Sequence, residues 1–141
     1  MHNKKREVVI TGMGSVSSIG FNNINILKKL KTNSTGYIEN DCFRVQADIL
    51  EKVNNVYNTG ERSIDFAAFS FINSLEDAKL TVKDIPDNSF LSFSSSKGGL
   101  SSLYNAATSN EKLLTNFNNY LAVSPLNNIC SIIGKNIPAS N

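Results

Sequence analysis

Hydrophobic residues recur at helical spacing in two stretches of the chain. In residues 62–79, apolar side chains return every three or four positions, and Phe69 widens the apolar face. Residues 22–31 place isoleucine and leucine largely on one side and lysines on the other, before a polar stretch ending at Gly36. The pattern therefore predicts a long helix over 62–79 and a short amphipathic helix over 22–31.

Other segments have the composition or alternation of β-strands. Residues 8–11 form a β-branched run closed by glycines, which is typical of a fully buried strand in a parallel sheet. Residues 43–47 alternate weakly, and residues 90–93 form a third short run. The Asn-rich stretch that follows 43–47, as far as Gly60, is expected to be a loop.

Two further helices are predicted toward the end of the chain. The first covers residues 100–114, and the second covers about 120–133, with Pro125 marking a start or kink and Gly134 ending it. Strands and helices thus alternate, which favours an α/β layered fold with a largely parallel sheet. No linker or repeat divides residues 1–141, so a single domain is expected.

Composition narrows the possible functions without naming one. The 141 residues are 40% hydrophobic and 18% charged, as in an ordinary globular protein. The net charge of +2 is spread thinly, which argues against a nucleic-acid surface. No apolar run reaches the ~20 residues of a membrane span, and no signal peptide is evident. Two cysteines without a secretion signal indicate a reducing, cytoplasmic setting, and a single histidine argues against a His-based metal site or triad.

Two glycine-containing turns invite a phosphate-binding interpretation. Gly12 and Gly14 follow the first predicted strand, but the dinucleotide fingerprint also needs glycine at the position of Ser17. The loop 94–99 carries Lys97 before its glycines, the reverse of the order in a P-loop. A structural turn is the favoured interpretation of both, and no cofactor is expected.

The candidate reactive side chains do not assemble into an active site. Cys130 lies in an apolar helical context without a nearby histidine, so we expect a core cysteine, and Cys42 has no catalytic neighbours. Asp65, Glu76 and Asp77 are expected to be solvated helix residues, because Glu76 and Asp77 are adjacent and point to different sides.

Several segments in order resemble one family, the β-ketoacyl-[acyl carrier protein] synthases of fatty acid and polyketide synthesis. Residues 8–20 resemble its opening V-V-I-T-G-[ML]-G-x-[VI]-S-P-[LI]-G, with Ser18 in place of the proline. Residues 62–67 and 74–80 resemble R-x-x-x-[FY]-[AS] and A-L-x-D-A-G-L. Residues 90–99 are similar in layout to the family's strand and G-x-G-x-G-G turn. The stretch from Phe117 through Pro125 to Gly134 is similar to a later segment of some members of the family.

The resemblance implies the amino-terminal part of a thiolase-like fold, with the family's nucleophilic cysteine and two histidines falling beyond Asn141. It therefore implies a subunit that is not catalytic alone and that forms an acyl channel and interface beside a catalytic partner. That partner would be a catalytic ketosynthase subunit or a complementary carboxy-terminal half, with acyl carrier protein engaged indirectly. The residues implied to line or gate the channel are Ser96, Lys97, Gly98, Gly99, Tyr120, Leu121, Ala122 and Val123.

Two alternatives remain open at this point. The chain can be one half of a split synthase whose decarboxylative condensation returns on complementation. It can also be a small nucleotide-binding α/β domain, although the missing third glycine disfavours that hypothesis.

Overall fold

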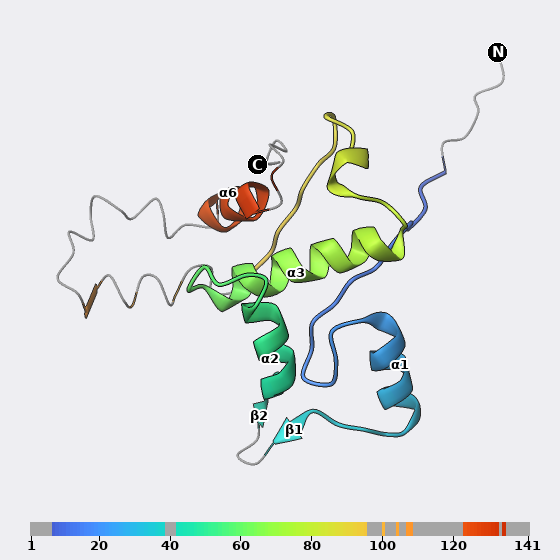
Figure 1. Ribbon diagram of the computed structural model, residues 1–141, viewed down its shortest axis with the longest axis vertical. Coiled ribbons are helices and arrows are strands. Elements are labelled where there is room, and N and C mark those ends of the chain that lie inside the picture. Colours follow the sequence, from blue (N-terminus) through green and yellow to red (C-terminus); the bar gives the residue numbers. More distant parts are fainter. Residues whose placement is uncertain are drawn as a thin grey trace.

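The long helix α3 (Arg62–Asp77) lies at the centre of the molecule, with the other elements on either side of it (Figure 1). The computed structural model describes residues 7–38, 42–95, 100, 104, 107–108, 123–132 and 134. Besides α3, its elements are α1 (Asn23–Lys31), β1 (Tyr37–Ile38), β2 (Cys42–Phe43), α2 (Ala47–Asn54), the 3₁₀ helix η1 (Val82–Asp84) and α6 (Val123–Ile132).

The buried apolar residues come from three helices, α2, α3 and α6. The helix α3 lies between the other two and contacts both of them. They are Ile49 and Val53 of α2, Ile64, Ala68 and Phe69 of α3, and Ile129 and Cys130 of α6. Cys130 is 8% exposed and packs against Phe71, Ile72, Val82, Ile85 and Leu91. The expectation of a core cysteine is therefore confirmed.

The helices predicted from periodicity are present. The predicted helix over 62–79 corresponds to α3, and the predicted helix over 22–31 corresponds to α1. Asn22 caps α1, because its side-chain oxygen accepts the N–H of Asn25 at 2.8 Å. At the other end of the chain, α6 has Pro125 in its first turn, and Gly134 follows it with a φ of +68°.

Two helices end in the same left-handed turn without a glycine. Lys79 has a φ of +57°, its N–H donates to the carbonyl of Glu76, and the N–H of Leu80 donates to the carbonyl of Leu75 at 2.8 Å. Asn33, with a φ of +51°, closes α1 through the equivalent pair of hydrogen bonds. This turn satisfies carbonyls that the helix leaves unpaired, at the cost of a strained backbone at a residue with a Cβ.

The predicted parallel sheet is not found among the described residues. Their only sheet is the antiparallel pair β1–β2, with Tyr37 opposite Phe43. The expected buried strand over 8–11 has no regular secondary structure and is exposed, with Val8 97% and Ile10 83% accessible. Residues 90–93 also form no strand with a described neighbour. A β-branched run becomes a buried strand only where other strands bond its backbone and helices cover it.

One helix, α2, was missed by the pattern of the sequence. Residues 43–47 were expected to form a strand, but only Phe43 belongs to one. The helix α2 begins at Ala47, the last residue of that expected strand, and continues to Asn54 through the stretch expected to be a loop. Its signal was the i, i+4 pair Ile49 and Val53, both buried against the core, with an acid in the first turn and a lysine in the last. The predicted helix over 100–114 lies largely outside the described residues.

Candidate functional site

The positions implied by the family resemblance fall mainly outside the described residues. This holds for Ser96, Lys97, Gly98 and Gly99 of the turn and for Tyr120, Leu121 and Ala122 of the later segment. Val123 is the first residue of α6, and its side chain is not described. The candidate site is therefore built from the residues around α3 that the structure does describe.

The opening Gly12–Gly14 turn lies directly against α3. A Cβ at Gly14 would collide with the carbonyl oxygen of Ser70 and lie 2.6 Å from the backbone nitrogen of Ser74. A Cβ at Gly12 would likewise collide with the carbonyl oxygen of Ser74. Glycine at these two positions therefore permits a backbone-to-helix approach that no other residue allows.

Hydrogen bonds from two helices hold the residue between those glycines. The N–H of Met13 donates to Oδ2 of Asp77 at 3.0 Å, and the carbonyl of Met13 accepts from Nδ2 of Asn23 at 2.8 Å. Asp77 belongs to α3 and Asn23 to α1, so this Met13 clamp joins the two helices. A phosphate would need the same amide and would meet the carboxylate of Asp77, so the geometry favours a structural turn.

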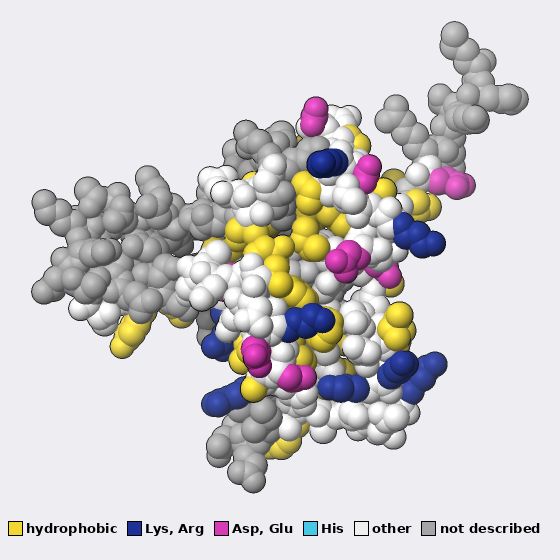
Figure 2. All heavy atoms as spheres, viewed as in Figure 1, with side chains coloured by type: hydrophobic (Ala, Val, Ile, Leu, Met, Phe, Trp, Pro, Cys, Tyr) yellow, Lys and Arg dark blue, Asp and Glu magenta, His cyan; other side chains and the backbone are white. Residues whose placement is uncertain are grey.

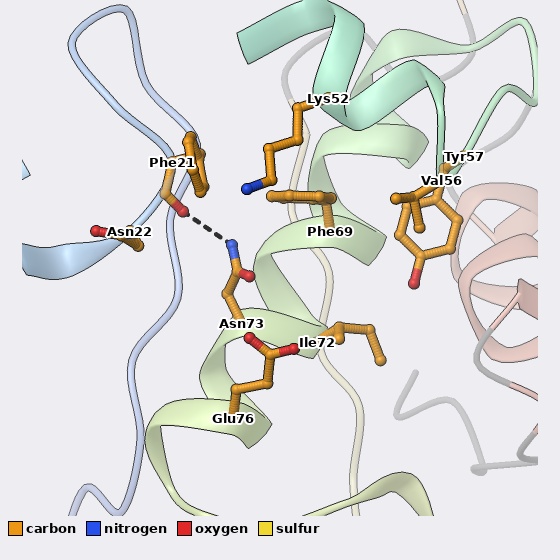
Figure 3. Close-up of a pocket in the computed structure, with 9 residues that line it drawn as sticks. All are labelled: Phe21, Asn22, Lys52, Val56, Tyr57, Phe69, Ile72, Asn73 and Glu76. Carbon is orange, nitrogen blue, oxygen red and sulfur yellow. Dashed lines mark hydrogen bonds between the residues drawn. The ribbon is translucent and has the colours of Figure 1, made fainter. Parts of the chain in front are cut away.

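A pocket with a volume of about 410 Å³ opens between α2, α3 and the segment that leads into α1 (Figure 3). Phe21 and Asn22 come from that segment, Lys52 from α2, and Val56 and Tyr57 from the turn after it. The remaining wall is one face of α3, formed by Phe69, Ile72, Asn73 and Glu76.

Aromatic rings form one end of this pocket. Phe21 and Phe69 meet edge to face with centroids 6.1 Å apart, and Nζ of Lys52 lies 4.1 Å from the centroid of Phe21. Nδ2 of Asn73 donates to the carbonyl of Phe21 at 2.8 Å, which fixes the ring-bearing segment to α3. The ammonium group of Lys52 is thereby held over the pocket by a cation–π contact.

The other end carries a carboxylate and a phenol. Burial raises the pKa of Tyr57, and the negative charge of Glu76 raises it further. The Tyr57 hydroxyl therefore keeps its proton at neutral pH and can donate a hydrogen bond. Lys52 and Glu76 give the pocket opposite charges on a mainly apolar wall.

The acidic residues of α3 differ from one another in their surroundings. Glu76 and Asp77 are exposed, as expected, but Asp65 is 4% exposed, so the expectation that it is solvated was wrong. Its Oδ1 accepts the backbone N–H of Thr59 at 3.0 Å and the Thr59 hydroxyl at 2.8 Å. Because these bonds satisfy the carboxylate inside the fold, Asp65 has a structural role in the turn that enters α3.

Within the part of the chain that the structure describes, no three His, Cys, Asp or Glu side chains gather as metal ligands. In the same residues, no helix has the length and apolar character to cross a membrane. Comparison of the chain with models of known protein families, with curated proteins and with solved structures found no match.

The sequence did not indicate the pocket, because its residues come from three separate segments. Phe69 was recognised as part of the apolar face of α3, but its contact with Phe21 spans 48 positions. Lys52 belongs to the helix that periodicity missed. A search for oppositely charged residues flanking the apolar face of α3 would have found Glu76 but not its counterpart on α2.

Proposed function

We propose that residues 1–141 form the amino-terminal part of a β-ketoacyl-[acyl carrier protein] synthase-like protein with a thiolase-like fold. In this proposal the chain is a non-catalytic component that contributes to the acyl channel and interface beside a catalytic partner. The observation that carries it is an uncovered strand-forming run, residues 8–10, immediately before a glycine turn docked on α3.

The uncovered run supports the need for a partner. Val8, Val9 and Ile10 are 97%, 72% and 83% exposed, and Phe90 in another expected strand is 78% exposed. Consecutive β-branched residues with an unpaired backbone gain stability when a neighbouring strand bonds them and apolar side chains cover them. Insertion of this run into a larger sheet would satisfy both requirements.

The glycines of the family motifs give a second, geometric line of support. The opening motif has glycine at 12 and 14, where a Cβ would strike α3. The motif A-L-x-D-A-G-L has glycine at the position of Lys79, where the backbone is left-handed with a φ of +57°. Local geometry therefore favours glycine at three motif positions, one of which this chain fills with lysine.

The chemistry of condensation assigns the catalytic role to the partner. Acyl transfer needs an accessible thiolate with a base or donors within hydrogen-bond reach. Cys130 is buried among Phe71, Ile72 and other apolar side chains, so it is not accessible to an acyl substrate. The partner would supply the nucleophilic cysteine and the two histidines that the family resemblance implies.

Association with a catalytic partner provides the test. The full chain is expressed alone and together with the polypeptide encoded next to it, and both are analysed by size-exclusion chromatography with light scattering. We expect a 1:1 or higher complex only on co-expression, with malonyl-dependent condensation confined to the complex. A chain that stays monomeric on co-expression, with no complex detected, would contradict the proposal.

Matched variants locate the interface. Val9→Lys places a charge in the uncovered run and is expected to abolish co-elution with the partner. Ile24→Lys places the same charge on α1 at a residue that is 67% exposed, and it is expected to leave the complex intact. If Val9→Lys and Ile24→Lys reduced co-elution with the partner equally, the assignment of residues 8–10 to the interface would be overturned.

A further inference from the structure

The pocket beside α3 carries two opposite charges that do not pair with each other. Among the residues that the structure describes, Lys52 contacts the Phe21 ring and forms no ion pair, and neither does Glu76. Figure 3 places the Lys52 ammonium beside the rings of Phe21 and Phe69, and the Glu76 carboxylate lower on α3, beside Asn73 and Ile72. Unpaired charges of opposite sign at the two ends of one pocket match a ligand that carries both charges.

Much of the wall beside the two charges is apolar, and Asn73 lies between them (Figure 3). Phe69 and Ile72 on α3 face Val56 and the ring of Tyr57 across the pocket. A cavity of about 410 Å³ lies within the range of roughly 300–1,000 Å³ typical of small-molecule sites. The ligand therefore has an apolar body as well as two charged groups.

We propose that this pocket binds a free α-amino acid with an apolar side chain, its carboxylate on Lys52 and its ammonium group on Glu76. The side chain of the amino acid lies against Phe69, Ile72 and Val56. This inference does not depend on the proposed ketosynthase role, since it uses only residues of α2, α3 and the segment before α1.

The spacing along α3 is compatible with such a ligand. Phe69 and Glu76 are seven residues apart, which is about 10 Å along the axis, and helical side chains lean back toward the amino terminus. A carboxylate and an ammonium on one carbon, each with one hydrogen bond of about 2.8 Å to the protein, together span about 8 Å. Lys52 and Glu76 are exposed and have long side chains, so both charged groups can approach one α-amino acid.

Electrostatics disfavours ligands with a single charge. A simple carboxylate would be attracted by Lys52 but repelled by Glu76. A simple amine, which is positively charged, would be attracted by Glu76 but repelled by Lys52. Both charges of the ligand are consequently needed.

Calorimetric titration of the full chain tests this with four probes: L-leucine, N-acetyl-L-leucine, L-leucinamide and glycine. Binding of L-leucine is expected to weaken at least tenfold when its ammonium group is acetylated or its carboxylate is amidated, because each change removes a charge-assisted hydrogen bond. Glycine, which has no side chain for the apolar wall, is also expected to bind at least tenfold more weakly.

Variants assign the two charges separately. Lys52→Gln is expected to weaken the binding of L-leucine at least tenfold, so that this variant binds L-leucine no more tightly than L-leucinamide. Glu76→Gln is expected to bind L-leucine no more tightly than N-acetyl-L-leucine. Lys83→Gln and Glu51→Gln, which change exposed charges outside the pocket, are the matched controls and are expected to bind L-leucine like the parent chain. Far-UV circular dichroism confirms that each variant retains its helices.

Two results would overturn the inference. One is an absence of L-leucine binding to the helical chain. The other is equal binding of L-leucine, L-leucinamide and N-acetyl-L-leucine, which would show an apolar pocket indifferent to charge. The association test of the proposed function reads out a different surface, so either proposal can fail without the other.

Discussion

The helices α2, α3 and α6 and the amino-terminal region of residues 7–43 are held by different forces. The three helices contribute all the buried apolar residues among those described, including Val53 and Ala68 at 0% exposure. In the amino-terminal region α1 buries no residue, and its Ile24, Leu27 and Leu30 are 67%, 56% and 55% exposed. Figure 2 shows hydrophobic and basic side chains together at the surface over α1. Packing therefore dominates in one region and is scarce in the other.

Polar contacts to the backbone attach the amino-terminal region instead. The Met13 clamp and the bond from Asn73 to the carbonyl of Phe21 connect it to α3. Between α1 and the β1–β2 pair, an open cavity of about 490 Å³ includes Ile26, Leu30 and Phe43 in its lining. Directional bonds fix where a segment lies, but each contributes only about 1 kcal/mol, so they do not replace burial.

The largest expected difference follows from truncating one apolar residue in each region. Phe69→Ala removes a ring that is 7% exposed and contacts Phe21, and it is expected to lower the free energy of unfolding by about 3–5 kcal/mol. Leu27→Ala, at a half-exposed residue of α1, is expected to cost less than about 1 kcal/mol. Urea unfolding followed by circular dichroism measures both, and similar costs would contradict the comparison.

The junction between the regions is tested at Gly14. Gly14→Ala forces the turn away from Ser70 of α3 and is expected to destabilise the protein by about 1–3 kcal/mol. Thr11→Ala, an exposed position in the same segment, is the control and is expected to change stability by less than about 0.5 kcal/mol. Hydrogen exchange of the Met13 amide reports whether the clamp opens, and unchanged protection in Gly14→Ala would refute tight docking.

The ends of α3 and α1 allow a matched substitution in each region. Lys79→Gly relieves a left-handed backbone and is expected to stabilise the protein by about 0.5–1 kcal/mol. Asn33→Gly is expected to gain only a few tenths of a kcal/mol, since asparagine tolerates this conformation better. Urea midpoints measure both; a loss of stability in Lys79→Gly would show that its side chain has a role beyond closing the helix.

The smallest effect concerns the pKa of Tyr57, which lies in the pocket between the regions. Because burial is the larger cause of its raised pKa and Glu76 the smaller, Glu76→Gln is expected to lower that pKa only part of the way to 10.0. A raised folded-state pKa means that Tyr57 contributes stability below its unfolded pKa and loses it as pH rises through the folded value. Tyrosinate absorbance measures the titration, with Tyr57→Phe identifying the signal and Glu51→Gln as control.

Periodicity predicted α1 and α3 because their apolar residues face one side regardless of what covers them. Gly12 and Gly14 were expected to form a structural turn, and their approach to Ser70 and Ser74 supports that interpretation. The strand over 8–11 could not be confirmed in the same way, since composition shows how a segment would pair but not whether a partner strand is present. The pocket could not be predicted from the sequence, because Phe21, Lys52 and Glu76 come together only in the tertiary fold.

The Met13 clamp also limits when the amino-terminal region can dock on α3 during synthesis, because Asp77 must first be synthesised. Its bond to Asp77 spans 64 positions, so Met13 leaves the ribosome before its partner and must wait for the whole of α3. At a synthesis rate of about 5–20 residues per second, that delay is on the order of 3–13 s. The β-branched run 8–10 is exposed during this delay and stays exposed in the folded chain, so it can associate with other unfolded strands both before and after the clamp forms. The Lys4-Lys5-Arg6 triplet that precedes this run supplies the like charges that oppose such association.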